Sequence, residues 1–395
     1  MASTSAVVIG AGIGGLAAAA GLHGAGWDVT VCERAAAIEP AGAGLALGPN
    51  GLRALDAIGA GEAARAHTVP QEIGIRTPDG RWLARSGTGH MVASRFGDPV
   101  ILLPRAQLID ALLARVPQAA LALATEVTSV GPGGPGTARV TTARGELDAG
   151  LVVAADGIRS ATRAALFPGH PGLRYARFTT WQLITRPPAG PVPMAETWGR
   201  GTVFGVMPLA DGRVYCYAAA PAAPGGRSAD ELAGLVSRFG RWHEPIPALL
   251  ASAPPSGVLR HDVAELARPL PSFHSGRVVL LGDAAHPMTP NLGQGACQAL
   301  EDAVVLSRLV AGLDAADVPA VLAGYTADRL PRTTEVVRWS HRAGQMTTWT
   351  APLAVAARNT AMRLAGRVAP GAMLRGLGPI YDWRPPAAGP GAAGR

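Results

Sequence analysis

A glycine-rich turn near the start of the chain constrains the fold most. Residues 6–9 are a short apolar run typical of a buried strand, and Gly10, Gly12 and Gly15 follow it directly before an alanine-rich helix at 16–22. In this spacing one glycine allows a tight turn, one lets a pyrophosphate approach the backbone, and one lets helix and strand pack closely. A second strand, 28–32, ends in Glu33, about 20 positions after Gly12, where an acid can bind ribose hydroxyls. The segment predicts a parallel α/β sheet that binds an adenine dinucleotide; a plain surface Glu at a strand end is the alternative.

A second stretch, 278–302, indicates which dinucleotide it is. Residues 278–281 form another apolar strand, Gly282 ends it, and Asp283 stands where the backbone leaves the sheet and can accept a ligand hydroxyl. Gly293, Gln294 and Gly295 then begin a long helix, whose free N–H groups suit a negatively charged ring. NAD and FAD share the first fingerprint, but only FAD needs this second site for a ribityl chain and ring. We therefore expect FAD.

A third motif lies between the other two. The buried strand 151–154 is followed by Asp156 and Gly157, and Arg163 comes within the next helix, 158–166. Asp156 can hold an arginine that meets phosphate, or it can cap this helix, and both roles are compatible.

The run from Gly282 through Asp283, Pro287, Pro290 and Gly293 to Gly295 resembles the second flavin motif of the single-component (group A) flavoprotein monooxygenases, which share the para-hydroxybenzoate hydroxylase fold. The resemblance implies non-covalent FAD, NADPH or NADH as co-substrate, and O₂. It also implies a flavin C4a-hydroperoxide that oxygenates a phenolic, polycyclic or heteroaromatic ring. In such an enzyme Arg105, at a helix start, reaches the flavin, and the glycine-rich loop 40–50 lies beside the ring. The cofactor-binding residues that follow are Gly10, Gly12, Ile13, Gly14, Gly15, Glu33, Arg34, Arg105, Asp156, Gly157, Gly282, Asp283, Pro290, Leu292, Gly293, Gln294 and Gly295.

The expected fold class is α/β. A Rossmann-like FAD-binding domain of the glutathione-reductase type, at 1–70, 100–171 and 272–335, is interleaved with a mostly antiparallel substrate sheet at 71–99 and 172–271. C-terminal helices at 336–384 and a disordered Pro/Ala/Gly-rich tail at 385–395 complete the division. The pattern also predicts a helix over 318–346 that breaks at Pro331.

Substrate-side residues are harder to assign, because aromatic side chains on a sheet are often plain core. The catalytic candidates are Pro290, which would shape the wall beside the reacting edge, and Tyr217, His90 and Trp181. Tyr215, Gln182 and Phe204 are further candidates for the substrate wall. His286 is expected to bond backbone near the pyrophosphate. The sheet carries few charges, which favours an apolar polycyclic or heteroaromatic phenol over a small benzoate.

Composition limits the other possibilities. All 35 basic residues are arginine, and the net charge of +7 is scattered, which argues against nucleic acid and suits phosphate-bearing cofactors. Three widely spaced cysteines indicate buried free thiols in a reducing cytoplasm. We expect the protein to be a monomer or homodimer. No metal-ligand spacing and no apolar run of about 20 residues occurs, so neither a metal nor a membrane span is expected.

Other functions stay open at this point. The same fold can serve an FAD-dependent oxidase or dehydrogenase, or an epoxidase, and a non-catalytic flavin-binding protein is a third class. A flavin halogenase is disfavoured, because the chain has no Trp-x-Trp-x-Ile-Pro stretch and no lysine.

Overall fold

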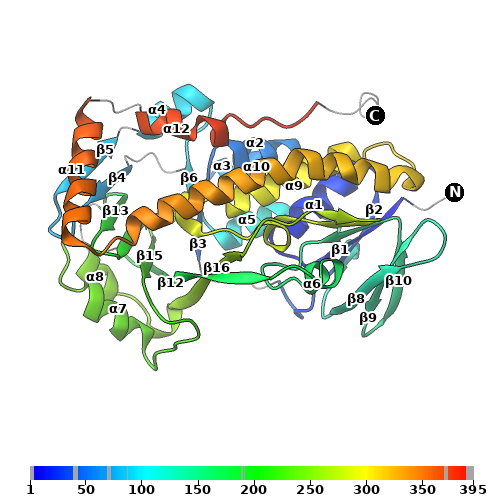
Figure 1. Cartoon of the computed structure of the whole chain (residues 1–395), viewed down its shortest axis with the longest axis horizontal. Helices are drawn as coiled ribbons and strands as arrows, with labels where there is room; N and C mark the ends of the chain where they lie inside the picture. Colours follow the sequence, from blue (N-terminus) through cyan, green and yellow to red (C-terminus); the bar gives the residue numbers. More distant parts are fainter. Residues whose placement is uncertain are drawn as a thin grey trace.

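The computed structural model describes residues 4–38, 43–68, 73–86, 88–187, 190, 192–368 and 372–387. A six-stranded sheet lies at one end of the molecule, with strand order β17-β18-β11-β1-β2-β7, and only β17 runs antiparallel to its neighbour (Figure 1). The central strands are short and apolar because both faces are covered. Their bounds are β1 Ser5–Ile9, β2 Asp28–Cys32, β7 Leu121–Ala122, β11 Leu151–Ala154, β17 His274–Ser275 and β18 Val278–Leu280.

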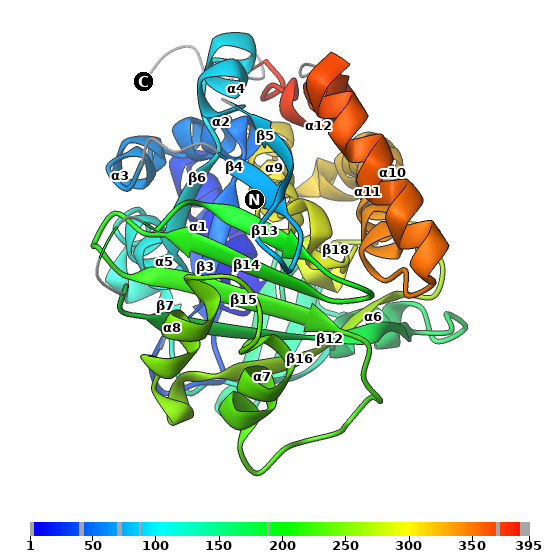
Figure 2. The same cartoon turned by 90° about the vertical axis from the view of Figure 1, so that its left-hand side faces the viewer.

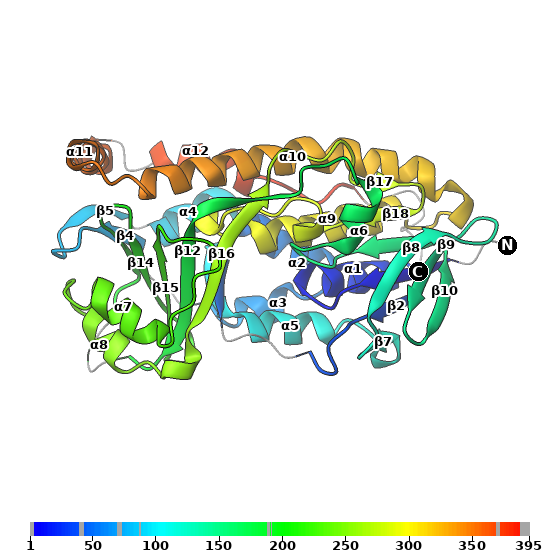
Figure 3. The same cartoon turned by 60° about the horizontal axis from the view of Figure 1, so that its bottom comes forward.

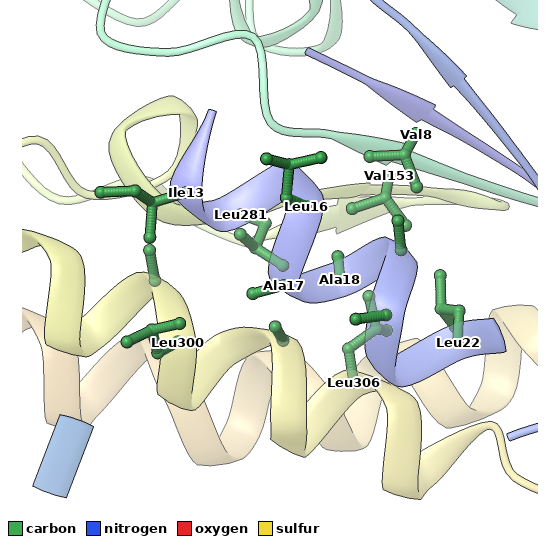
Figure 4. Packing of buried hydrophobic residues seen from close by; sticks show 14 of the residues in the cluster. Val8, Ile13, Leu16, Ala17, Ala18, Leu22, Val153, Leu281, Leu300 and Leu306 are labelled. Carbon is green, nitrogen blue, oxygen red and sulfur yellow. The ribbon is translucent and has the colours of Figure 1, made fainter. Parts of the chain in front are cut away.

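Two helices pack on this sheet to form the main core. Helix α1 (Ile13–Gly24) carries Ala17 and Ala18 where it meets α9 (Gly295–Leu309), and these small side chains let the two helices approach closely (Figure 4). Leu16 of α1 and Leu300 of α9 are fully buried in the same cluster. The fingerprint helix is thus held against the helix that begins at Gly295.

A seven-stranded sheet at the other end has the order β16-β12-β15-β14-β13-β4-β5 and is antiparallel except for the β13–β4 pair. Helices α7 (Glu231–Phe239) and α8 (Ile246–Ala251) cover one of its faces (Figure 2). Strands β13 and β16 were not expected from the sequence. The bounds are β4 Ile73–Arg76, β5 Trp82–Ser86, β12 Leu173–Thr185, β13 Ala195–Trp198, β14 Val203–Pro208, β15 Val214–Ala220 and β16 Leu259–Leu266.

One long helix, α10 (Val318–Thr347), runs along both sheets (Figure 3). The predicted break at Pro331 is wrong, because the helix continues through it. Pro331 lacks the N–H that would bond the Ala327 carbonyl oxygen. The Thr333 hydroxyl, two residues further on, donates to the Arg329 carbonyl oxygen at 2.8 Å. The C-terminal part forms α11 (Pro352–Val368) and α12 (Ala372–Tyr381).

The segment expected as a flexible loop at 40–50 is partly a strand. Residues 39–42 lie outside the described residues, but β3 (Gly44–Leu47) pairs with β6 (Ile101–Pro104), so this backbone is held in place. The remaining elements are α2 Pro49–Ala57, α3 Gly61–Arg65, α4 Thr88–Phe96, α5 Arg105–Leu113, β8 Val127–Pro132, β9 Ala138–Thr142, β10 Gly145–Ala149 and α6 Ala161–Leu166. The division into domains stays a prediction, and most of the expected tail (388–395) lies outside the described residues.

Candidate active site

The three sequence motifs meet at the carboxyl edge of the six-stranded sheet. The backbone N–H of Ala155 donates to Ile9 O at 2.9 Å, and that of Leu281 donates to Ala154 O at 3.0 Å. A methyl group on Gly14 would lie 2.7 Å from Leu281 Cδ2, so the fingerprint helix directly touches the second stretch, 278–302. Open parallel sheets bind ligands in the crevice outside this edge.

The three fingerprint glycines have different structural roles. Gly10 has φ +98°, and a Cβ there would lie 2.6 Å from Ala155 O. A Cβ on Gly15 would overlap the Gly10 carbonyl oxygen, so Gly15 permits strand–helix packing. A Cβ on Gly12 would meet no atom within 4 Å. The space above Gly12 is therefore open for a ligand, which is the requirement for a pyrophosphate at a helix start.

Glu33 closes the turn at the end of β2. Its Oε2 accepts from Ala11 N–H at 2.8 Å and its Oε1 from Ala35 N–H at 2.9 Å. The carboxylate is thereby fixed beside the fingerprint, as ribose binding requires. Arg34 is exposed just beyond it.

Asp156 serves the helix α6 rather than an arginine. Its Oδ2 accepts from Thr162 N–H at 3.1 Å, while its buried Oδ1 has no hydrogen-bond partner. The Arg163 guanidinium instead donates to the backbone oxygens of Ile158 and Ala284, at 2.6 and 2.9 Å. Of the two roles that the sequence left open for Asp156, the structure shows the hydrogen bond to the start of α6. Arg163 ties this motif to the Asp283 loop, and Asp156 Oδ1 is left for a ligand.

Asp283 lies at the bottom of the crevice. Its side chain is reached by solvent although protein atoms surround it closely. Desolvation raises the pKa of Asp283, and His286, Arg105 and Arg163 oppose the rise. Because the side chain is exposed, its oxygens are accessible to a ligand hydroxyl. Arg105 begins α5 near enough to act on Asp283, and its contact with the flavin stays a prediction.

A buried network behind Asp283 was missed by the sequence interpretation. His286 Nε2 lies 2.6 Å from Asp302 Oδ2, which also accepts from Gly282 N–H at 2.9 Å. Arg329 Nε donates to Asp302 Oδ1 at 2.7 Å, and its Nη1 donates to Glu301 at 2.9 Å. The expectation that His286 bonds backbone is wrong, since its partner is a carboxylate. The adjacent acids in the motif's helix were the only available signal for this network.

Burial alone would raise the pKa of Asp302, but His286 and Arg329 outweigh it and hold the pKa at about 2. Burial would lower the pKa of Arg329, and Asp302 and Glu301 raise it instead. The charges of the network are therefore kept at neutral pH, and they fix the backbone at Gly282.

Buried side chains fix the N-terminal end of α9 in position. Gly293 has φ +61°, and Gln294 is buried, with its Oε1 accepting from Asn50 Nδ2 at 2.9 Å. Asn50 also donates to Glu301 at 2.7 Å. Pro290 is exposed, and Leu292 and Gly295 are half-buried beside the crevice.

One face of the seven-stranded sheet points toward β3 and the start of α9. Tyr215 and Tyr217 lie on it with ring centroids 5.9 Å apart, and they pack with Ala46 of β3. A Cβ on Gly293 would lie 3.4 Å from Ala46 Cβ, so this face adjoins the helix start. Gln182 donates to the Tyr215 hydroxyl at 3.0 Å.

Tyr217 is paired with a carboxylate on the same face. Its hydroxyl donates to Glu196 Oε1, and Trp198 Nε1 donates to Glu196 Oε2 at 2.6 Å. Desolvation first, and then Glu196, raise the pKa of Tyr217 well above its usual value. Tyr217 is therefore a neutral phenol whose oxygen keeps a free lone pair.

Of the other two substrate candidates, Trp181 does not lie on this face. Trp181 lies in the core under α7 and α8 with Phe204, and its Nε1 donates to Glu231 at 2.7 Å. His90 belongs to α4 at a position whose side chain lies outside the described residues.

The geometry fits FAD on three counts. The open space at Gly12, the unpartnered Asp156 Oδ1 and the solvent-reached Asp283 all lie along one sheet edge. The arrangement defines an FAD-dependent oxidoreductase. In the described part of the chain no group of three or more metal-ligating side chains occurs, and no helix there is long and apolar enough to cross a membrane.

Comparison with known proteins agrees with this class. The family model described as "FAD binding domain" matches residues 3–340. The chain is 38% identical over 365 residues to an aurachin C monooxygenase/isomerase of Stigmatella aurantiaca, covering 91% of this chain and 93% of the relative. It is 33% identical over 368 residues to a 2-heptyl-3-hydroxy-4(1H)-quinolone synthase of Pseudomonas aeruginosa, with the same coverage of 91% and 93%.

Among solved structures, Klebsiella pneumoniae HpxO complexed with FAD and uric acid superposes with a TM-score of 0.84 at 28% identity, covering 93% of this chain and 95% of that one. The chain belongs to the family of FAD-dependent aromatic monooxygenases that carry this FAD binding domain. The predicted family, fold class, cofactor and enzyme class are confirmed, and the oxidase or dehydrogenase alternative is not favoured.

Proposed function

We propose that this monooxygenase oxygenates a planar bicyclic or heteroaromatic ring that bears an O–H or N–H group. The Tyr217–Glu196 pair is the observation that carries this proposal, because a Tyr217 oxygen that already donates to Glu196 can only accept from the substrate. The wall around it is apolar, with Met194, Met207 and Tyr215 in one cluster. Two similar proteins have names or titles that include a quinolone and uric acid, both bicyclic heteroaromatics.

The chain's own residues then divide the work. Bound FAD supplies the chemistry of accepting a hydride from NAD(P)H and of activating O₂. Gly10, Gly12 and Glu33 bind its adenosine and pyrophosphate part. Asp283 accepts a ribityl hydroxyl, and the N–H groups at Gly293 and Gln294 favour negative charge on the ring.

Substrate activation is assigned to a proton relay. The substrate O–H or N–H gives its proton to Tyr217 Oη while Tyr217 passes its own proton to Glu196 Oε1. The phenol stays neutral throughout, in keeping with its raised pKa. The electron density left on the substrate ring favours attack by an electrophilic oxygen. The apolar wall and Pro290 keep water from the reacting edge.

The test is a reaction under ¹⁸O₂ with bicyclic heteroaromatic phenols and their O- or N-methylated forms. We expect one ¹⁸O atom in the product and loss of turnover with the methylated forms. Product without the label would exclude oxygen insertion, and equal turnover of the methylated forms would exclude the relay.

We also infer a cytoplasmic protein that is a monomer or homodimer. Cys32, Cys216 and Cys297 are all free and buried, as suits a reducing compartment. Light scattering on the FAD-loaded protein tests the oligomeric state, and a stable tetramer would contradict this inference.

A further inference from the structure

A cavity lies behind the Asp283 loop, on the side of α10. Its volume is about 360 Å³. The loop contributes Ala285, His286 and Pro287, and the rest comes from the segment after β16 and from one face of α10. The walls are mostly apolar, with Leu270, Phe273, Leu330 and Val337 among the lining residues. A cavity of this size holds part of a drug-sized ligand.

Two buried polar atoms in the lining have no partner. Glu265 is 2% exposed; its Oε1 binds Arg174 Nη2 at 2.6 Å and His341 Nδ1 at 3.0 Å, while its Oε2 has no hydrogen bond. His286 is 5% exposed, and its Nδ1 is likewise without a hydrogen bond, although its Nε2 holds Asp302. Buried polar atoms without partners are costly, so both indicate a ligand group at this place.

The rim of the cavity is cationic. Arg268, Arg338 and Arg342 line it and are exposed, and none of them has an ion-pair partner in the part of the chain that the structure describes. Arg338 and Arg342 stand one turn apart on α10, which places both guanidinium groups on the same helix face. Free arginine side chains at this spacing suit phosphate oxygens, which they bind bidentately.

We propose that this cavity binds the nicotinamide dinucleotide that the monooxygenase uses as reductant. The ligand's carboxamide offers both N–H donors and an acceptor, which match Glu265 Oε2 and either tautomer of His286 Nδ1. Its flat apolar ring suits the wall, and its diphosphate suits the Arg338–Arg342 rim. The position is also appropriate, since the cavity shares the 285–287 loop with the flavin site.

The identity of the ligand rests on the proposed oxygenase function, whereas the choice of binding residues does not. The binding residues assigned outside the FAD crevice are Glu265, Arg338 and Arg342. His286 bonds Asp302, and Asp302 bonds the Gly282 N–H. A ligand bound to His286 is therefore connected, through these two hydrogen bonds, to the backbone that carries Asp283.

Calorimetric titration of the FAD-loaded protein tests the site. The ligands are NADP⁺, NAD⁺ and ADP-ribose, which lacks the nicotinamide. For the double variant R338A/R342A we expect the Kd of each of these ligands that the wild type binds to rise about tenfold or more. For Glu265→Gln we expect the Kd of NADP⁺ or NAD⁺ to rise and that of ADP-ribose to stay unchanged, because only the carboxamide partner is altered.

Arg144→Ala is the matched control, since Arg144 is exposed on the β9–β10 turn and its removal costs one arginine away from the cavity. FAD content and melting temperature of every variant are measured alongside, so that a folding defect is separated from a binding defect. Unchanged Kd values in R338A/R342A with full FAD content would overturn the proposal. So would a loss of affinity for the aromatic substrate alone. Neither outcome depends on whether the ¹⁸O₂ experiment succeeds.

Discussion

The imidazole of His286 and the carboxylate of Asp302 form a buried pair at 2.6 Å, and the second bond of Asp302 Oδ2 goes to the backbone of Gly282. Arg329 neutralises the same carboxylate from the opposite side. The turn that presents Asp283 to a ligand is therefore fixed by charges that never reach solvent. Removing one member leaves the others buried without a partner, which costs more than the pair itself contributes.

Asp302→Asn is expected to lower the free energy of unfolding by about 3 to 5 kcal/mol at pH 7, because the buried Arg329 loses a counter-charge. The pKa of Asp302 is depressed to about 2 in the folded protein, against about 3.9 when unfolded. Its contribution is thus fully present above pH 4 and is lost as the pH falls through 2. Urea unfolding between pH 7 and 2 measures this, and a stability difference between variant and wild type that stays constant down to pH 2 would contradict it.

Gly12→Ala and Gly15→Ala should separate binding from folding. A Cβ on Gly12 meets no protein atom, whereas one on Gly15 overlaps the Gly10 carbonyl. We expect Gly12→Ala to melt like the wild type as apoprotein and to lose FAD affinity by roughly 10-fold or more, since the methyl group fills the pyrophosphate space. Gly15→Ala should melt lower even without FAD. Apoprotein melting curves with FAD titrations provide both numbers, and equal behaviour of the two variants would refute the assignment.

Asp283→Ala should weaken FAD binding by roughly 10- to 100-fold, the cost of one charge-assisted hydrogen bond. Flavin absorbance after gel filtration, followed by titration of the apoprotein, measures the loss. Asp110→Ala, on the exposed side of α5, is the control and should retain FAD. A yellow Asp283 variant with wild-type affinity would show that this carboxylate does not hold the cofactor.

Tyr217→Phe should uncouple the enzyme. The variant keeps the ring but removes the oxygen that accepts from the substrate, so we expect NAD(P)H oxidation to continue while product per NAD(P)H falls about tenfold or more. Glu196→Gln should act in the same direction because it removes the final proton acceptor. Trp181→Phe, on the opposite face, should instead lower stability through the lost bond to Glu231. Comparing peroxide release with product in all three variants decides the point.

Much of the cofactor site was predictable from the sequence because its chemistry requires backbone geometry. Gly10, Gly12 and Gly15 follow a strand at a fixed spacing, and Asp283 follows another, so local sequence was enough to place them. Their meeting at one sheet edge followed from parallel strands having their carboxyl ends together.

The supporting residues were not predictable in the same way. Arg329 lies far along the chain from Glu301 and Asp302, and nothing in its local sequence distinguishes it from an exposed helical arginine. Trp181 and Tyr217 both lie on strands with mixed patterns, so the sequence did not decide which face each occupies. Pro331 suggested a helix end, but α10 continues through it to Thr347.

Helix α10 also carries a geometric constraint on how this chain can vary. Arg329 and Arg342 belong to one uninterrupted helix, separated by about 20 Å at 1.5 Å per residue. A single residue inserted between Arg329 and His341 would rotate the part of the helix after it by about 100° and turn His341 away from Glu265 while Arg329 stayed in register. Homologues that share both groups should therefore tolerate length changes before Val318 or after Thr347, but not in the interval between.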